Sequence, residues 1–184
     1  MPKKRYISHI KINPPDYTIK HSPCPHCRRT GNLIYHGYLY GISECRCHQV
    51  TRGQRIFCSN RNKRKGCGRT FSCFLAKYIY RSLLSTTTAW EFLKAYRSGL
   101  SLEKAYANLN PLCTLSFNTL LRFWKKFTLN TSEIRTYILN NYSQHHDHFK
   151  SHIDETIQHI EQCLYHPRLD PLAYYQIQSQ TTII

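Results

Sequence analysis

The sequence predicts an α+β protein in which a small β module is followed by an all-α domain and a C-terminal helical extension. Two observations support this division. Within residues 23–78, paired cysteines alternate with glycines and with β-branched or aromatic runs, which is typical of short strands folded around a metal ion. From residue 79 onward, apolar residues recur every three to four positions, which is the period of amphipathic helices.

Charge separates the same regions. The chain of 184 residues contains 26 Lys and Arg against 10 Asp and Glu, a net charge of +16. Residues 1–78 carry 16 basic and 2 acidic side chains, residues 79–128 carry 7 and 2, and residues 129–184 carry 3 and 6. A polyanion is therefore the expected partner of the first two-thirds of the chain, and the last third is excluded from that surface.

The N-terminal residues and the number of cysteines together indicate where in the cell the protein is expected. No run of about 18 apolar residues is present to cross a membrane. Residues 1–5 are basic but lack the apolar stretch of a secretion signal. We therefore expect a cytoplasmic protein, in which nine cysteines favour metal binding over disulfides. Residues 1–22 are predicted to form a basic arm along phosphates or a disordered tail, since Pro14 and Pro15 exclude a helix.

Residues 23–78 are predicted to form a zinc ribbon. Cys24 and Cys27 are separated by two residues, a spacing at which two thiolates can bind one tetrahedral ion, and a second cysteine pair follows. We therefore predict a Zn²⁺ site whose ligands are Cys24, Cys27, Cys58 and Cys67. Strands are expected at residues 33–40 and 52–58, the second of which leads directly to Cys58.

The loop between the second pair of cysteines is long and basic. Eight residues separate Cys58 from Cys67, where a usual ribbon has two, and the entropic cost of closing the longer loop is modest. Its four cations are predicted to bind phosphates: Arg61, Lys63, Arg64 and Lys65. Other cysteines and a histidine of this module could also bind a metal ion. A second site, or a replacement ligand in the first, could come from Cys45, Cys47, His48 and Cys73.

Residues 79–128 are predicted to form a helix-turn-helix domain. Ser85 and Ser101 are N-cap candidates for two helices that Gly99 separates, and Pro111 ends the second helix. A linker of a few residues leads to a third helix that begins near Ser116. Its apolar residues recur at i, i+3, i+4 and i+7, which leaves the opposite face polar and basic.

That polar face of the third helix is the predicted contact with DNA bases. It consists of Asn118, Thr119, Arg122, Lys125 and Lys126. Asn118 and Thr119, near the start of the helix, could reach base edges, whereas the three cations would hold bases or phosphates. The alternative interpretation is a plain three-helix bundle with a solvated outer face.

Residues 129–184 are expected to form C-terminal amphipathic helices and a tail. The pattern predicts a short helix at residues 132–141, a longer one at residues 149–164, and a frayed end from Gln176. The apolar stripe of the longer helix would pack on the helix-turn-helix domain or bind a second copy of the chain or a transposase partner.

Several motifs resemble the start of bacterial insertion-sequence transposases. The ribbon motifs are Cys24-Pro25-x-Cys27, Arg52-Gly53-Gln54-Arg55-Ile56-Phe57-Cys58 and Cys67-Gly68-Arg69-Thr70-Phe71. The later motifs Gly99-Leu100-Ser101, Ala105 and Asn118-Thr119-Leu120-Leu121-Arg122 are similar to the helix-turn-helix of the same family. The resemblance covers about residues 22–128 and is to the upstream DNA-binding protein of such elements. It implies binding to terminal inverted repeats in a bacterial nucleoid and regulation of the element's promoter, without the family's catalytic domain.

We therefore expect a protein that binds double-stranded DNA at specific sequences and is not an enzyme. Phosphoryl transfer would require clustered carboxylates to hold metal ions, and the acids of the basic region, Asp16, Glu44, Glu91 and Glu103, are scattered among different elements. The alternatives are an RNA-binding zinc-ribbon protein and a metal-dependent nuclease or transposase fragment. Duplex DNA is favoured because a helix fits the major groove of B-form DNA, whereas that of A-form RNA is deep and narrow.

Overall fold

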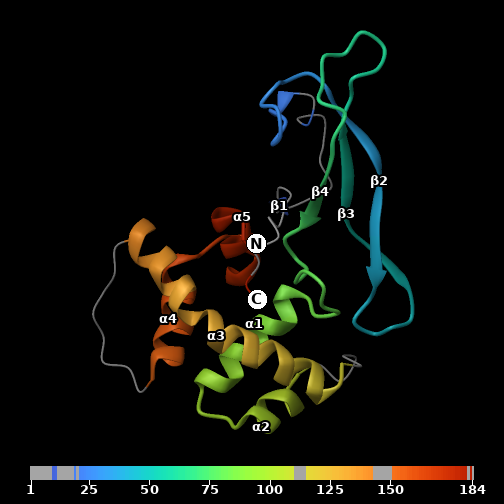
Figure 1. Cartoon of the computed structure of the whole chain (residues 1–184). Helices are drawn as coiled ribbons and strands as arrows, with labels where there is room; N and C mark the ends of the chain where they lie inside the picture. Colours follow the sequence, from blue (N-terminus) through green and yellow to red (C-terminus); the bar gives the residue numbers. More distant parts are fainter. Residues whose placement is uncertain are drawn as a thin grey trace. The chain divides into compact units, whose positions relative to one another are not determined.

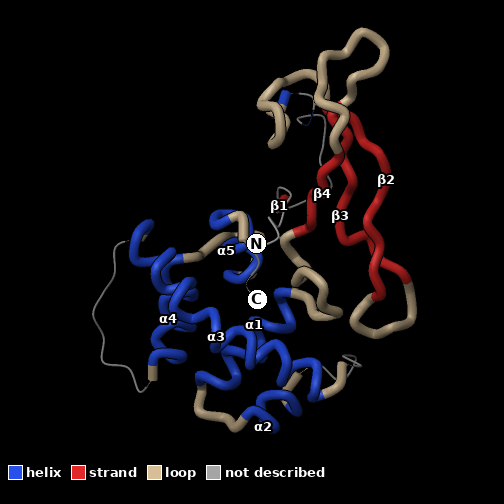
Figure 2. The backbone as a smooth tube through the Cα atoms, viewed as in Figure 1, coloured by secondary structure: helices blue, strands red, loops and turns tan. Residues whose placement is uncertain are grey.

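The computed structural model describes residues 10–11, 19, 21–109, 115–142, 151–181 and 183. This part of the chain contains four strands and five helices, which confirms the mixed α+β class (Figure 1, Figure 2). The chain divides into two compact units. Unit 1 comprises residues 1–41 and 49–75, and unit 2 comprises residues 42–48 and 76–184. The predicted basic arm of residues 1–22 lies largely outside the described residues.

Unit 1 is built on a single sheet. Its strands are β1 (Ile10–Lys11), β2 (Leu33–Ile42), β3 (Gln49–Cys58) and β4 (Thr70–Leu75), arranged in the order β1-β4-β3-β2. β3 and β4 are antiparallel, with Ile56 opposite Phe71, and β1 pairs with β4 in parallel. β2 is therefore an edge strand of the sheet. Both segments that the sequence predicted as strands lie within β2 and β3.

One side of the sheet faces a small core. Ile56 and Cys58 of β3 and Phe71 and Cys73 of β4 are buried there, together with Ile19, Cys24 and Leu33. The alternate residues of β3 and β4 lie on the other side, where Arg55 is exposed. A core this small rarely stabilises a domain by hydrophobic burial alone, so unit 1 is the kind of module that depends on a structural metal ion.

Unit 2 is helical. Its helices are α1 (Thr86–Arg97), α2 (Leu102–Ala107), α3 (Phe117–Asn141), α4 (His152–Cys163) and α5 (Pro171–Ser179). α1 packs against α2, α4 and α5, and α3 packs against α2 and α4. The core contains residues from all five helices, among them Phe92, Ala105, Phe123, Phe127, Ile138, Ile160 and Leu172. None of the described helices is both long and apolar enough to cross a membrane.

The first two helices begin where the sequence predicted. The side chains of Ser85 and Ser101 accept hydrogen bonds from the backbone N–H of Thr88 and Lys104, and each thereby satisfies a donor at a helix start. α2 ends at Ala107 and α3 begins at Phe117, whereas the predicted end of the second helix at Pro111 lies outside the described residues.

The prediction of a separate helix at residues 132–141 is wrong, because α3 runs unbroken from Phe117 through residues 128–132 to Asn141. This stretch contains neither Gly nor Pro. Its threonines fit within the helix because Thr128 and Thr131 donate their hydroxyls to the carbonyls of Lys125 and Thr128, at 2.9 Å in each case. Phe127, Ile134 and Ile138 form one buried stripe, so the core holds both halves of α3 as a single helix.

The predicted frayed end from Gln176 is also wrong for the described residues. α5 extends to Ser179, and Gln176 is only 1% exposed. Its side-chain amide donates to the carbonyls of Ala76 at 2.8 Å and Tyr78 at 3.3 Å, and its oxygen accepts from the backbone N–H of Ile183 at 3.5 Å. A buried amide with three backbone partners joins the end of the chain to the segment before α1.

Candidate metal centre and nucleic-acid interface

The structure brings the four predicted zinc ligands together. The Sγ atoms of Cys24 and Cys67 are 3.8 Å apart, as are those of Cys27 and Cys58, and all four lie within 4.8 Å of one another. Four thiolates bound tetrahedrally to zinc at about 2.3 Å place their sulfur atoms about 3.8 Å apart. The number, type and spacing of the donors are therefore compatible with a structural zinc ion, which these four cysteines would hold.

Two similarly hydrogen-bonded turns form the centre. In the first, the N–H of Cys24 donates to the carbonyl of Arg29 at 2.9 Å, and that of Arg28 donates to Cys24 at 2.8 Å. In the second, the N–H of Cys58 donates to Arg69 at 2.9 Å, and that of Gly68 donates to Cys58, also at 2.9 Å. Cys24 and Cys58 thus occupy equivalent positions in the two turns, as do Cys27 and Cys67.

The eight-residue loop takes the place of the two residues found in the first turn. The N–H of Gly66 donates to the carbonyl of Ser59 at 2.9 Å, so the loop leaves and returns at one point. A Cβ atom on Gly66 would lie 2.2 Å from the carbonyl oxygen of Ser59, which explains why glycine stands there. Asn32 holds both ends, since its carbonyl accepts from the N–H of Ser59 at 2.8 Å and its side-chain oxygen accepts from that of Lys65 at 3.1 Å.

Backbone N–H groups surround the sulfur atoms. The N–H of His26 lies 3.4 Å from the Sγ of Cys24, and that of Cys67 lies 3.3 Å from the Sγ of Cys58. A hydrogen bond from the backbone of Arg29 lowers the pKa of Cys27 to about 7, whereas burial raises the pKa of Cys58 to about 12 and also raises the pKa of Cys24. A dication among these sulfurs favours the thiolate form of all four.

The alternative metal-binding residues are divided between the units. Cys73 is buried in the core of unit 1, on β4. Cys45, Cys47 and His48 lie together in the turn between β2 and β3, with Cys45 and Cys47 joined by a disulfide and the Nδ1 of His48 3.0 Å from the Sγ of Cys47, so this predicted second group could hold a metal ion only with its cysteines reduced. None of these residues lies within the four-cysteine group, so a substitute ligand for the first site does not come from them.

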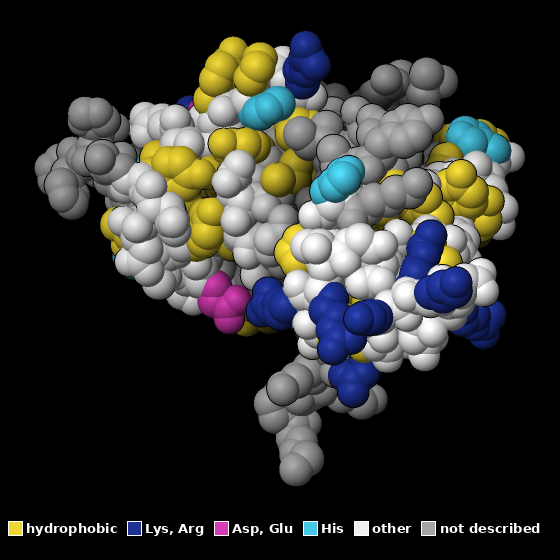
Figure 3. Space-filling model, turned by 90° about the horizontal axis from the view of Figure 1, so that it is seen from above, with side chains coloured by type: hydrophobic (Ala, Val, Ile, Leu, Met, Phe, Trp, Pro, Cys, Tyr) yellow, Lys and Arg dark blue, Asp and Glu magenta, His cyan; other side chains and the backbone are white. Residues whose placement is uncertain are grey.

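The four predicted phosphate-binding cations, Arg61, Lys63, Arg64 and Lys65, are all exposed on the loop. Arg28, Arg29 and Arg69, which were not among the predicted phosphate-binding residues, also lie exposed beside the cysteines. The sequence could have indicated these three residues, because arginine follows closely after each of the two cysteine turns. Residues 21–41 and 49–75 contain nine Lys and Arg and neither Asp nor Glu. Figure 3 shows several Lys and Arg side chains gathered on one part of the surface.

The predicted base-reading residues lie on one face of α3. Asn118, Arg122, Lys125 and Lys126 are exposed and Thr119 is half-buried. The opposite side of these turns is buried through Leu120, Phe123 and Phe127. Trp124 fixes the helix against α1, with ring centroids 4.3 Å from Tyr96 and 6.2 Å from Phe92.

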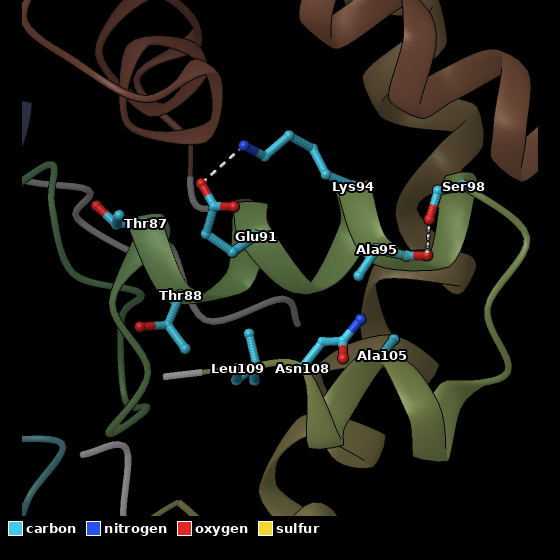
Figure 4. A pocket seen from close by; sticks show the side chains of 9 residues that line it. All are labelled: Thr87, Thr88, Glu91, Lys94, Ala95, Ser98, Ala105, Asn108 and Leu109. Atoms are coloured by element: carbon cyan, nitrogen blue, oxygen red, sulfur yellow. Dashed lines mark hydrogen bonds and ion pairs between the residues drawn. The ribbon is translucent and has the colours of Figure 1, made fainter. Parts of the chain in front are cut away.

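A hollow of about 620 Å³ lies between α1 and α2, lined among others by Glu91, Lys94 and Asn108 (Figure 4). Within it, Glu91 forms an ion pair with Lys94 at 2.8 Å. Two other carboxylates of unit 2 hold the start of α1: Glu44 accepts from the hydroxyl of Thr88 at 2.9 Å, and Asp170 accepts from that of Thr86 at 2.9 Å. Each of these three acids therefore has a partner within unit 2.

In comparisons with known proteins, no family model, curated protein sequence or solved structure matches the chain.

Proposed function

We propose that the chain is a sequence-specific, double-stranded-DNA-binding protein of the transposase-accessory or transcription-regulator kind, which acts by binding rather than by catalysis. Unit 1 acts as a zinc ribbon that grips the DNA backbone. The helices α1 to α3 act as the helix-turn-helix part, and α3 reads base edges. The transposase resemblance and the charge of the chain support the choice of DNA as the partner.

The observation that carries this proposal is the exposed face of α3. Asn118 and Arg122 are one helical turn apart on the side opposite the buried stripe, so both side chains project from the same surface. Arginine pairs with guanine and asparagine with adenine through two hydrogen bonds each in the major groove. Lys125 and Lys126 follow on the same exposed side, where they would contact the flanking phosphates.

Unit 1 supplies affinity rather than sequence reading. Each Lys or Arg that neutralises a phosphate releases counterions, which strengthens binding to any sequence at low salt. The loop of residues 59–66 brings four such cations to one place, and the metal centre fixes both ends of that loop. Zinc in this account has a structural role: it holds the two cysteine turns together.

A partner protein or second copy would have to use surfaces other than the apolar stripe of α4. That stripe is already buried inside unit 2 through Ile157, Ile160 and Leu164. Among the large apolar side chains in the described part of unit 2, Leu129 of α3 and Tyr165, which follows α4, are the most exposed, at 79% and 78%, and a homodimer or a transposase contact would form through them.

Selection from random duplex DNA tests the proposal. The zinc-loaded chain is mixed with random duplexes at about 0.15 M salt, with a pool of RNA as competitor, and bound fragments are sequenced. The expected result is an enriched motif that RNA does not displace. Fragments without any shared motif would reduce the protein to an electrostatic binder, and displacement by RNA at equal concentration would refute DNA as the target.

A further inference from the structure

The outer side of the unit 1 sheet carries a row of aromatic rings that the proposed DNA contacts do not use. His36 of β2 lies beside Phe57 of β3, with ring centroids 5.7 Å apart, which places both on the side opposite the core. Tyr38 and Tyr40 follow His36 at alternate positions of β2 and therefore share this side. They are 57% and 59% exposed, and their ring centroids are 6.0 Å apart.

Cations and hydroxyl groups border these rings. Arg55 is exposed on the same side of β3, directly opposite Ser72 of β4. The guanidinium of Arg61 lies 6.0 Å from the ring centroid of Phe57, which extends the row toward the basic loop. Residues 21–41 and 49–75 provide no carboxylate to repel an anion.

We propose that this sheet face binds single-stranded nucleic acid by stacking its bases on the aromatic rings. Exposed tyrosines on a solvated sheet offer flat surfaces to unpaired bases, and neighbouring arginines bind the phosphates between them. In a duplex the base faces are already stacked on one another, so the rings would have nothing to stack on. A second copy of the chain would bring the same excess of positive charge to the surface, which argues against self-association there.

This inference does not depend on base reading by α3. The two surfaces belong to different units, and the ligand of the sheet face is an unpaired strand rather than a duplex. Each proposal can therefore fail while the other stands.

The test measures binding of fluorescently labelled oligo(dT), oligo(U) and a matched duplex to the zinc-loaded full chain. Removing one stacking ring costs about 5- to 150-fold in affinity. We therefore expect Tyr38→Ala and Tyr40→Ala each to weaken binding of a single strand within that range, with little effect on the duplex. Tyr38→Phe keeps the ring and should bind as the unaltered chain does. The two single-stranded arms show whether DNA or RNA is the source of the strand.

Tyr35→Ala is the matched control, since Tyr35 lies on the same strand but on its opposite side and is 45% exposed. It should leave single-strand binding unchanged, and the zinc content of every variant reports whether unit 1 is still folded. The proposal is overturned if Tyr38→Ala and Tyr40→Ala bind oligo(dT) and oligo(U) as tightly as Tyr35→Ala. It is equally overturned if these substitutions only convert a dimer to a monomer, which would make the face a contact between copies.

Discussion

Excision of the basic loop separates the two roles that the account gives to the second cysteine turn. The variant replaces residues 59–66 by Pro-His, the two residues found between Cys24 and Cys27. The paired hydrogen bonds of the two turns already match, so the shorter connection has a template within the same protein. Metal binding should survive this change, while the grip on phosphates should not.

The size of each effect follows from the structure. Shortening the loop from eight residues to two halves its length twice, which lowers the entropy of loop closure by about 1.2 kcal/mol in favour of folding. The hydrogen bonds that Lys65 makes with Asn32 and Arg29 are lost, and so is the one from the N–H of Ser59 to Asn32, because proline has no N–H; these losses offset part of that gain. Four cations disappear, so the salt dependence of duplex binding, log K against log [salt], should become shallower by up to about 3.6.

Two assays measure these quantities. Metal analysis gives the number of zinc ions per chain, and titrations of a labelled duplex between about 0.05 and 0.2 M salt give the slope. A control variant that keeps the loop but changes its four cations to Gln should show the same loss of slope. Loss of zinc on excision would refute the equivalence of the two turns. An unchanged slope in both variants would refute the loop as a phosphate contact.

Three other changes test the remaining parts. Cys27→Ser should release zinc and unfold unit 1, with a loss of zinc-linked folding free energy on the order of 10 kcal/mol or less. Cys163→Ser, the control, should keep its full zinc content. If Cys27→Ser still bound one zinc ion per chain with unaltered affinity, the ligand assignment would be contradicted. Arg122→Ala should weaken binding to the selected sequence by about 1–3 kcal/mol in titrations, with Arg168→Ala as the charge-matched control. Equal losses on random and selected DNA would demote α3 to a phosphate contact. Gln176→Leu should destabilise unit 2 by about 1–3 kcal/mol in urea unfolding, because the buried carbonyl of Ala76 and the partly buried carbonyl of Tyr78 lose their donor; an unchanged midpoint would show that water replaces it.

The metal centre was predictable because its signal is local. A Cys-x-x-Cys pair constrains its own turn, and a second pair then has few other ways to satisfy its thiols in a small basic module. The equivalence of the two turns was hidden by loop length. Cys58 and Cys67 are nine positions apart in sequence, and only the hydrogen bonds from Cys58 to Arg69 and from Gly68 to Cys58 show that the turn closes as the first one does.

The errors in the helical unit came from tertiary contacts. The helix at residues 132–141 was predicted as a separate element, but burial of Phe127 and Ile134 on one stripe keeps α3 continuous. The end of the chain from Gln176 was predicted to fray because the hydrogen-bond partners of Gln176 lie about 100 positions earlier in the chain, where a local sequence pattern does not reveal them. Serine caps, in contrast, act within four residues, so Ser85 and Ser101 were identified correctly.

The most direct test of the account is to measure zinc content and duplex binding on the same sample during chelation. Native mass spectrometry of the full chain with a selected duplex gives both quantities at each chelator concentration. The account predicts one zinc ion per chain, loss of DNA binding in step with loss of that ion, and recovery of both when zinc is added back. A zinc-free chain that binds the duplex at full affinity would contradict it.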